Sequence, residues 1–193
     1  MDDLALSVRT ARPEDAADLA RIYIEAWQDT YAGVISHSLL GAMSLRTHTA
    51  RWHATIRAME KNSGTVLVVE DARSGVIGLC SLGRARDGGC GYDGEVYTLY
   101  VDPAFLGRGA GRALLAGAFE AFKARKMRSC LIWAHARNNA CFFYEAMGGR
   151  RIATRTTRLM GELTPEIGFG WKRLTARRQT RPIQSGSDQS DQS

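Results

Sequence analysis

The sequence predicts an α/β fold in a single globular domain. Runs of β-branched and aromatic residues alternate along the chain with stretches whose apolar residues recur every three or four positions. The length of 193 residues fits one domain, and 45% hydrophobic with 24% charged residues is typical of a soluble globular protein. We expect the domain to span residues 1–174. Residues 175–193, rich in Arg, Gln, Ser and Asp, are expected to form a disordered polar tail.

The N-terminal part of the chain is expected to contain one strand followed by helices. Leu6–Arg9 alternates as a short strand does. Pro13, followed by two acidic residues, is typical of the first turn of a helix, and the apolar stripe that follows extends to Trp27. A second helical stretch, Ser38–Met59, forms one helix or two, with Ser44 as a possible N-cap of the second.

Strands are expected next. Thr65–Glu70 and Val76–Leu82 are apolar runs separated by Asp-Ala-Arg-Ser-Gly, which predicts a hairpin. The polar stretch Gly83–Gly94 contains five glycines and predicts a mobile loop or a long hairpin tip. Glu95–Val101 is the following strand.

A glycine-rich loop follows this strand and opens a helix, Gly109–Met127. Its glycines occupy alternate positions, 107, 109 and 111. Glycines allow close approach of the backbone to a phosphate, and the free N–H groups of a helix start attract an anion. The spacing fits neither G-x-G-x-x-G nor G-x-x-x-x-G-K-[ST], so neither a dinucleotide-binding turn nor a P-loop is predicted.

The rest of the chain continues the alternation of strands and helices. Cys130–Ala136 is an apolar strand, and the helix Asn138–Met147 is expected to stop at a Gly-Gly pair. Two strands, Arg150–Thr157 and Ile167–Trp171, follow. Simple alternation in the first of these predicts that Arg151, Ala153 and Arg155 share one face.

Composition argues against several other classes of protein. The acidic start MDDLALSVRT and the lack of any apolar run of about 20 residues predict a cytoplasmic protein without membrane association. The net charge of +6 is concentrated after residue 150, without interleaved aromatic residues, so a solvated basic surface is favoured over nucleic-acid binding. The four histidines and four cysteines lack metal-ligand spacing, and no metal is expected.

Two motifs resemble those of the Gcn5-related N-acetyltransferase (GNAT) family. Leu106–Gly111, reading LGRGAG after YTLYVDP, resembles the family's pyrophosphate loop, commonly [QR]-x-x-G-x-[GA]; Leu106 departs from the usual Gln or Arg. Asn138–Gly149 resembles the family's motif of an Asn, a helix bearing Phe-Tyr and a closing Gly-Gly. With the N-terminal helix and the closing EIGFGW, the resemblance covers residues 6–174.

The resemblance implies a mixed, mostly antiparallel sheet of six or seven strands, with helices on both faces and two central strands splayed apart. The pantetheine arm of acetyl-CoA, the acetyl donor, would lie in the splay and pair with backbone of the Glu95–Val101 strand, and the pyrophosphate would lie on the loop. Asn138 would cap its helix or contact the pantetheine. The implied donor-binding residues are Leu99, Tyr100, Val101, Leu106, Gly107, Arg108, Gly109, Ala110, Gly111, Arg112 and Asn138.

The resemblance also implies an N-acetyltransferase in which a primary amine attacks the thioester directly. Tyr144 would protonate the departing thiolate, or else only pack against the donor. Glu95 would accept the amine proton through water, or be a surface carboxylate; Glu166 and water itself are the other candidates. Trp27, Tyr31 and Tyr97 would line the acceptor pocket, although Trp27 and Tyr31 fit simple core packing equally well.

Several alternatives stay open at this point. A non-catalytic acyl-CoA-binding sensor of the same fold would have the same loop. The acceptor is a small-molecule or peptide amine: polyamine, amino acid, aminoglycoside-like antibiotic or protein N-terminus, with few acidic residues to favour a polyamine. The protein would be a monomer or a homodimer.

Overall fold

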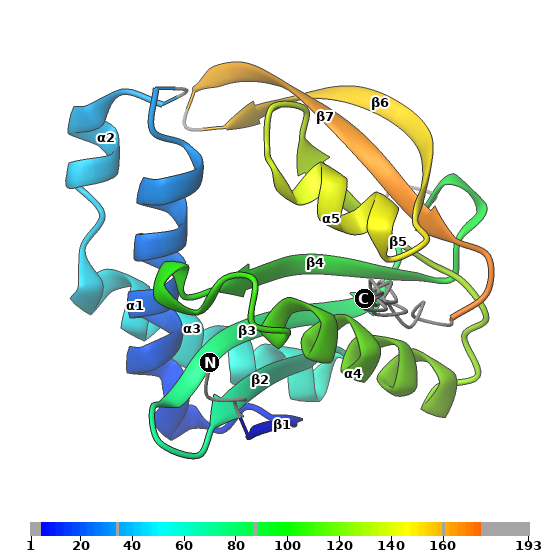
Figure 1. The fold of residues 1–193 in the computed structure, drawn as a ribbon, viewed down its shortest axis with the longest axis horizontal. Coiled ribbons are helices and arrows are strands. Elements are labelled where there is room, and N and C mark those ends of the chain that lie inside the picture. The colour runs from blue at the N-terminus through cyan, green and yellow to red at the C-terminus, as the bar shows by residue number, and fades with distance from the viewer. Residues whose placement is uncertain (1–4, 34, 87–88, 160, 175–193) are drawn as a thin grey trace, which may run out of the picture.

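A seven-stranded sheet of order β1-β2-β3-β4-β5-β7-β6 forms the centre of this computed structural model (Figure 1). All neighbouring strands are antiparallel except β4 and β5, which are parallel. The mixed, mostly antiparallel sheet is therefore confirmed. The strands are β1 (Leu6–Thr10), β2 (Thr65–Asp71), β3 (Gly75–Arg84), β4 (Gly94–Val101), β5 (Cys130–His135), β6 (Arg150–Leu159) and β7 (Glu162–Trp171).

The structure describes residues 5–33, 35–86, 89–159 and 161–174. The polar tail expected at residues 175–193 lies outside the described residues. Among the described residues, none of the helices has the length and apolar character needed to cross a bilayer.

Helices cover both faces of the sheet. On one face, α4 (Ala110–Ala124) and α5 (Ala140–Ala146) contribute to a core that contains Phe119, Tyr144 and Trp171. On the other face, α1 (Ala16–Thr30) and α3 (Leu45–Lys61) pack on β2, β3 and β4. The short elements are α2 (His37–Gly41) and the 3-10 turns η1 (Pro13–Asp15), η2 (Gly89–Gly91) and η3 (Pro103–Phe105).

Most expected elements are present, with shifted ends. The stretch expected to be one or two helices is two, and the Ser44 hydroxyl accepts a hydrogen bond from the Thr47 N–H (3.4 Å), so Ser44 is the expected N-cap. The helix after the glycine loop ends at Ala124, because Lys126 adopts a positive φ of 61° that an α-helix does not allow. The last strand begins at Glu162, five residues before the expected start, because it pairs with β6 over its whole length.

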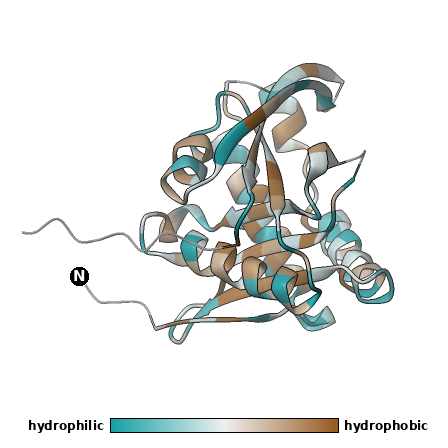
Figure 2. Ribbon diagram, turned by 90° about the vertical axis from the view of Figure 1, so that its right-hand side faces the viewer, coloured by the Kyte–Doolittle hydropathy of each residue, from teal (hydrophilic) through white to brown (hydrophobic). Residues whose placement is uncertain are grey.

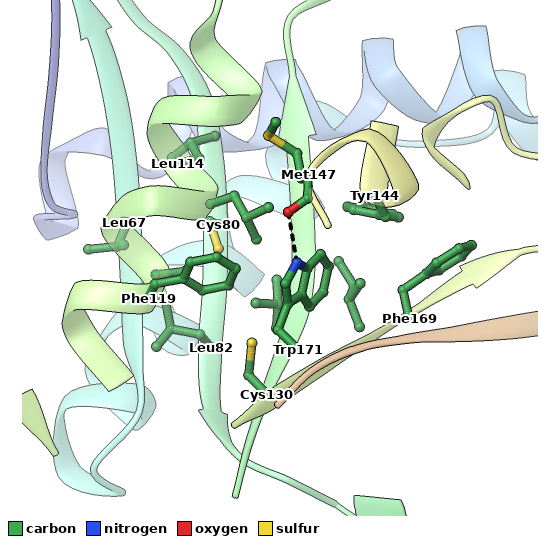
Figure 3. Packing of buried hydrophobic residues seen from close by; sticks show 14 of the residues in the cluster. Leu67, Cys80, Leu82, Leu114, Phe119, Cys130, Tyr144, Met147, Phe169 and Trp171 are labelled. Carbon is green, nitrogen blue, oxygen red and sulfur yellow. Dashed lines mark hydrogen bonds between the residues drawn. The ribbon is translucent and has the colours of Figure 1, made fainter. Parts of the chain in front are cut away.

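Burial of one sheet face against α4 and α5 forms the larger core (Figure 3). The Trp171 indole N–H donates to the carbonyl of Met147 (3.0 Å), which ties β7 to the end of α5. Hydrophobic residues gather along the central strands, and hydrophilic residues lie on the outer parts of the helices (Figure 2). Burial of such a face is the main favourable term in folding.

Two bulges determine which side chains face which way. In β4, Val96 pairs with Leu82 and Thr98 pairs with Ser81, so Tyr97 is an extra residue. Val96 and Leu99 therefore both face α4, and Tyr100 faces α1. An extra residue also lies between Arg151 and Ala153 in β6.

The second bulge overturns the expected alternation of β6. Arg151 pairs with Glu145 of α5, whereas Arg155 lies over the ring of Trp133 in β5. The two arginines therefore lie on opposite faces of the sheet. Simple alternation failed because one extra residue reverses the direction of every later side chain.

The parallel pair separates partway along its length. Only Gly94–Val96 pair with Cys130–Ile132, although β4 continues to Val101 and β5 to His135. From Tyr97 onward, the edge of β4 that faces β5 has no strand partner in the described part of the chain. This splay is the one that the resemblance implies.

Candidate functional site

A cleft of about 520 Å³ opens where β4 and β5 separate. The glycine loop lines one part of it, and Arg137 and Asn138 line another. Apolar walls come from the unpaired end of β4, from η3 and from α5, through Leu99, Val101, Phe105 and Phe143. The cleft is thus apolar along its length with polar groups at its ends, as ligand sites commonly are.

The glycine loop has the backbone conformation that only glycine adopts without strain. Gly107 has φ of 74° and Gly109 has φ of 92°, both in the left-handed region. The N–H of Ala113 donates to the carbonyl of Gly109 (2.9 Å) as the first bond of α4. The earlier amides of the helix start are therefore not used by the helix, and its positive dipole end lies at the cleft.

This donor set fits a phosphate-bearing ligand. Gly107, Gly109, Gly111 and Arg112 line the cleft, so backbone amides and one guanidinium share its surface. At Gly107 an added Cβ would meet no atom within 4 Å, so the backbone is openly accessible there. Leu106 is 56% exposed and also lines the cleft.

Two other loop residues that the sequence singled out, Arg108 and Ala110, do not line the cleft. The Arg108 guanidinium lies 5.7 Å from the ring centre of Phe105, at the rim of the loop. Ala110 is buried in the core beneath the loop. The cleft lining from this part of the loop is therefore limited to Gly107, Gly109, Gly111 and Arg112.

Asn138 and Tyr144 lie together on the α5 side of the cleft. The Asn138 Oδ1 accepts a hydrogen bond from the Ala140 N–H (2.8 Å), which fixes the start of α5. The Tyr144 ring packs against Phe143, Phe169 and Trp171, with ring centres 5.3 to 6.3 Å apart. Burial raises the pKa of Tyr144, so its hydroxyl stays protonated as a hydrogen-bond donor.

On the opposite side of the splay, aromatic residues of α1 surround Tyr100. The Trp27 indole N–H donates to the Tyr100 hydroxyl (3.0 Å), and Tyr100 itself lines the cleft. The rings of Trp27 and Tyr31 are in contact, tilted by 47° with centres 4.8 Å apart, and both residues are buried. They do not line the cleft directly; their neighbours Ala26 and Thr30 do.

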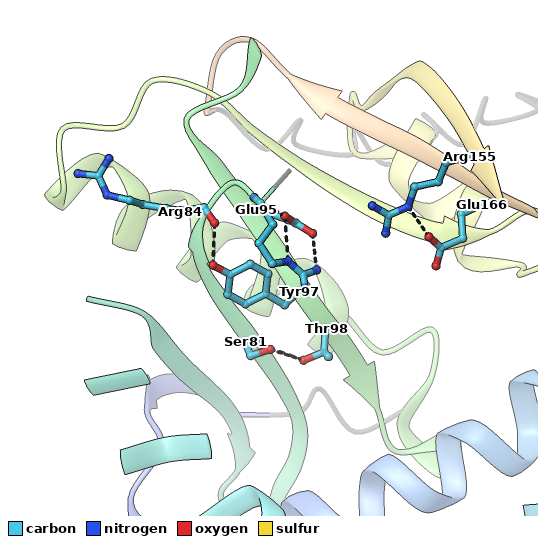
Figure 4. A network of polar contacts seen from close by, with 8 residues as sticks. Ser81, Arg84, Glu95, Tyr97, Thr98, Arg155 and Glu166 are labelled. Atoms are coloured by element: carbon cyan, nitrogen blue, oxygen red, sulfur yellow. Dashed lines mark hydrogen bonds and ion pairs between the residues drawn. The ribbon is translucent and has the colours of Figure 1, made fainter. Parts of the chain in front are cut away.

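Glu95 lies in the part of β4 that pairs with β5, and Tyr97 lies just beyond it (Figure 4). Neither residue lines the cleft. The Glu95 carboxylate accepts hydrogen bonds from the Arg86 backbone N–H (2.9 Å), Nε (3.2 Å) and Nη2 (2.5 Å), and Glu95 is 2% exposed. The Tyr97 hydroxyl donates to the carbonyl of Arg84 (2.7 Å). These two expected site residues are thus engaged with the β3–β4 loop.

A second polar group lies on the face of β5, β7 and β6 that is turned away from α5, which we call the outer face. The Arg155 Nε donates to Oε2 of Glu166 (2.7 Å; Figure 4). The Arg155 guanidinium also lies 4.1 Å from the ring centre of Trp133. Glu166 is in register with both Arg155 and His135. Sequence analysis named Glu166 but missed Arg155 and Trp133, because only the strand order brings them together.

His135 joins the outer face to the aromatic residues of α1. Its ring meets the Tyr31 ring edge to face at 5.9 Å. Burial lowers the pKa of His135, the Arg137 charge lowers it further, and Glu166 opposes both. The Arg137 N–H donates to Nδ1 (3.1 Å), so the neutral ring keeps its proton on Nε2.

Among the described residues, no three His, Cys, Asp or Glu side chains gather as ligands of a metal ion. Polar groups near the splay include the hydroxyls of Tyr100 and Tyr144, which line the cleft, and the imidazole of His135 with the carboxylate of Glu166, which do not. This set can donate hydrogen bonds and accept a proton. Such groups are suited to moving protons to and from a molecule bound in the cleft.

Comparison with known proteins gives consistent matches. The model of the acetyltransferase (GNAT) family matches residues 16–149. The uncharacterized N-acetyltransferase YuaI of Bacillus subtilis is 30% identical over 171 residues, which cover 89% of this chain and 95% of that protein.

Solved structures match over most of the chain. A ribosomal-protein-alanine N-acetyltransferase from Brucella melitensis has a TM-score of 0.67 at 25% identity and covers 86% of this chain and 98% of its own. YncA of Salmonella typhimurium, solved with its cofactor acetyl-CoA, has a TM-score of 0.67 at 24% identity, covering 89% and 95%. The PaiA N-acetyltransferase of Thermoplasma acidophilum, solved with coenzyme A, has a TM-score of 0.61 at 19% identity, covering 85% and 98%. Because YncA and PaiA are only 24% and 19% identical to this chain, their similarity supports a shared fold alone.

Proposed function

The chain belongs to the GNAT acetyltransferase family, and from this premise we propose that it transfers the acetyl group of acetyl-CoA to a primary amine by direct attack. The observation that supports the proposal most is the cleft between the unpaired ends of β4 and β5, which reaches the glycine loop at the start of α4. We assign the activity to residues 1–174.

The cleft suits an extended donor with a pyrophosphate at one end. The amides of Gly107–Arg112 would bind the pyrophosphate, because a helix start offers unused N–H groups and a positive dipole end. The unpaired backbone of Leu99–Val101 would pair with the pantetheine amides, and Asn138 lies across from it. The thioester would then lie near Tyr100 and Tyr144.

The transfer needs a neutral amine and two proton movements. The amine nitrogen forms a bond to the acetyl carbon, the bond from that carbon to sulfur breaks, and the products are an N-acetyl amine and free coenzyme A. A lysine-like amine with a pKa of about 10.4 is mostly protonated near neutral pH, so a nearby group must accept its proton. The departing thiolate gains from a hydrogen-bond donor.

Tyr144 is our proposed donor to the thiolate. Its pKa is raised by burial, so the phenol is held protonated in the pH range in which the thiolate forms. A thiol pKa of about 8.5 makes complete proton transfer from such a phenol unfavourable. Tyr144 therefore acts mainly by hydrogen bonding to sulfur while the proton is supplied from the amine side or from water.

For the proton acceptor we favour Glu166 and keep Glu95 as the competing candidate. Neither Glu95 nor Glu166 is among the residues that line the cleft, so the two carboxylates differ in which of their oxygens are occupied. Both oxygens of Glu95 accept hydrogen bonds from Arg86. Glu166 uses only Oε2 toward Arg155 among the described residues, and it is in register with His135 at the splay. Its second oxygen is available for an amine or for a water molecule bound to one.

One experiment separates this proposal from a non-catalytic acyl-CoA-binding sensor. The full chain is mixed with acetyl-CoA and a panel of amines, and free thiol and N-acetyl product are measured together. The panel includes small amines and a peptide N-terminus, since one similar structure is named for a ribosomal protein. Equal amounts of thiol and product support the transferase; binding of acetyl-CoA without either product contradicts it.

A further inference from the structure

We propose that the acetyl acceptor carries a carboxylate beside its amine, as an α-amino acid does, and that Arg155 binds this carboxylate while Glu166 receives the amine. The inference rests on the proposed function. It is carried by the geometry of one Arg–Glu pair on the outer face.

The pair lies at the level of the splay. The last paired residues of the parallel strands are Val96 and Ile132. Continued in the same register, Leu99 would lie opposite His135, and His135 is paired with Glu166 across β5 and β7. Glu166 is therefore level with Leu99, which lines the cleft.

Arg155 is held in place and keeps one edge of its guanidinium available. Its Nε donates to Glu166, and its plane lies 4.1 Å from the ring centre of Trp133. Among the described residues, Nη1 and Nη2 have no other partner, and the side chain is 36% exposed. Two parallel N–H groups on a fixed plane match a carboxylate in bidentate geometry.

Glu166 completes a site for both charges of one small molecule. Its Oε1 accepts no hydrogen bond from the described residues, and its side chain is 19% exposed. The ion pair holds Oε1 and the Nη groups next to each other. In an α-amino acid the ammonium and the carboxylate are attached to the same carbon, so the acceptor offers its two charges at a similarly short spacing.

Charge balance favours a zwitterion over a polycation. Arg155 and Glu166 are together neutral, so a neutral zwitterion leaves no unpaired charge on the outer face. A polyamine carries at least two cations, and this pair offers a single carboxylate. Its second cation would therefore lie close to Arg155 without a carboxylate of the pair to bind it. Buried or half-buried charges without partners are costly.

Two other Arg–Glu pairs of the chain lack this arrangement. Glu95 accepts three hydrogen bonds from Arg86 and is 2% exposed, so its oxygens are already engaged. Arg151 donates its Nε to Glu145 (2.6 Å) and lies over Phe169, but it is on the α5 face. Arg151 is thus a matched control: same strand, same donor atom and an aromatic neighbour, away from the splay.

The experiment measures acetyl transfer by the full chain. The twenty protein amino acids are screened with acetyl-CoA, and the best one is compared with its amide and with its decarboxylated amine. All three substrates are then measured with Arg155→Gln, Arg155→Lys and Arg151→Gln. Comparing variants on one substrate removes the effect of different amine basicities.

We expect Arg155→Gln to raise KM for the amino acid about 10- to 100-fold, the range for loss of a charge-assisted hydrogen bond. Loss of the ion pair with Glu166 should affect all three substrates alike, so the KM for the amino acid should rise about 10- to 100-fold relative to that for the amide and the decarboxylated amine. Arg151→Gln should match the native protein on all three. Arg155→Lys should recover part of the loss, because it restores the charge without the planar fork.

Two results would overturn the inference and are distinguishable. Equal use of the amino acid, the amide and the amine, or an equal effect of Arg155→Gln on all three, would reject carboxylate recognition while the transferase stands. Absence of product with every amine, in a protein that binds acetyl-CoA, would reject the proposed function and this inference together.

Discussion

Replacing Tyr144 by phenylalanine is expected to slow acetyl transfer without disturbing the fold. The change removes one hydroxyl and keeps the ring, which packs against Phe143, Phe169 and Trp171. The aromatic contacts of the core therefore remain. Only the donor that faces the cleft is lost.

The size of the effect follows from the kind of hydrogen bond. A bond to a charged acceptor contributes about 1.5–3 kcal/mol, which corresponds to about a 10- to 100-fold fall in kcat for a thiolate leaving group. Because burial raises the pKa of Tyr144, the native protein should show no loss of activity from Tyr144 ionisation below about pH 10.

The assay is thiol release at saturating acceptor, with melting temperature measured in parallel. Tyr92→Phe, which removes a hydroxyl from a residue that does not line the cleft, is the control and should retain native kcat. An unchanged kcat for Tyr144→Phe would show that Tyr144 only packs against the donor. A large fall in melting temperature would attribute the loss to folding instead.

Three further predictions concern the loop, acid stability and the proton acceptor. Gly109→Ala should weaken acetyl-CoA binding measured by calorimetry, because a φ of 92° is strained for any residue with a side chain. Gly75→Ala, at a φ of 72° in a distant turn, is the control and should lower the stability of the protein without changing acetyl-CoA binding. Arg9 lowers the pKa of Asp15 below its ordinary 3.8, so the ion pair stabilises the fold fully above that value and progressively less as the pH falls through the folded pKa. Asp15→Asn should lower the melting temperature near neutral pH, and the difference from the native protein should shrink as the pH falls below 3.8. Glu166→Gln should lower kcat/KM about 100-fold at neutral pH, and activity should partly recover as rising pH deprotonates the amine. A pH–rate profile identical to that of the native protein would exclude Glu166 as the proton acceptor.

The local elements followed from the sequence because their signals are local. The Ser44 cap, the hairpin of β2 and β3 and the glycine loop depend on residues within a few positions of each other. Propensity, capping and turn chemistry act over that distance, so a single sequence contains them. The ends of α4 and β7 were less well predicted, since tertiary pairing decides where an element stops.

The outer face could not be predicted, because strand order and bulges create it. β7 inserts between β5 and β6, which places Glu166 beside His135 and Arg155. The extra residue after Arg151 then turns Arg155 toward Trp133 rather than toward α5. Neither event leaves a periodic signal in the sequence.

For this protein the sequence by itself determined the glycine loop and the family, because the loop's backbone conformation depends on glycines that lie within a few positions of each other. Only the tertiary structure decided which carboxylate oxygens are already occupied by hydrogen bonds. Glu95 and Glu166 look alike as sequence. They differ because Arg86 satisfies both oxygens of the first, whereas Arg155 contacts a single oxygen of the second.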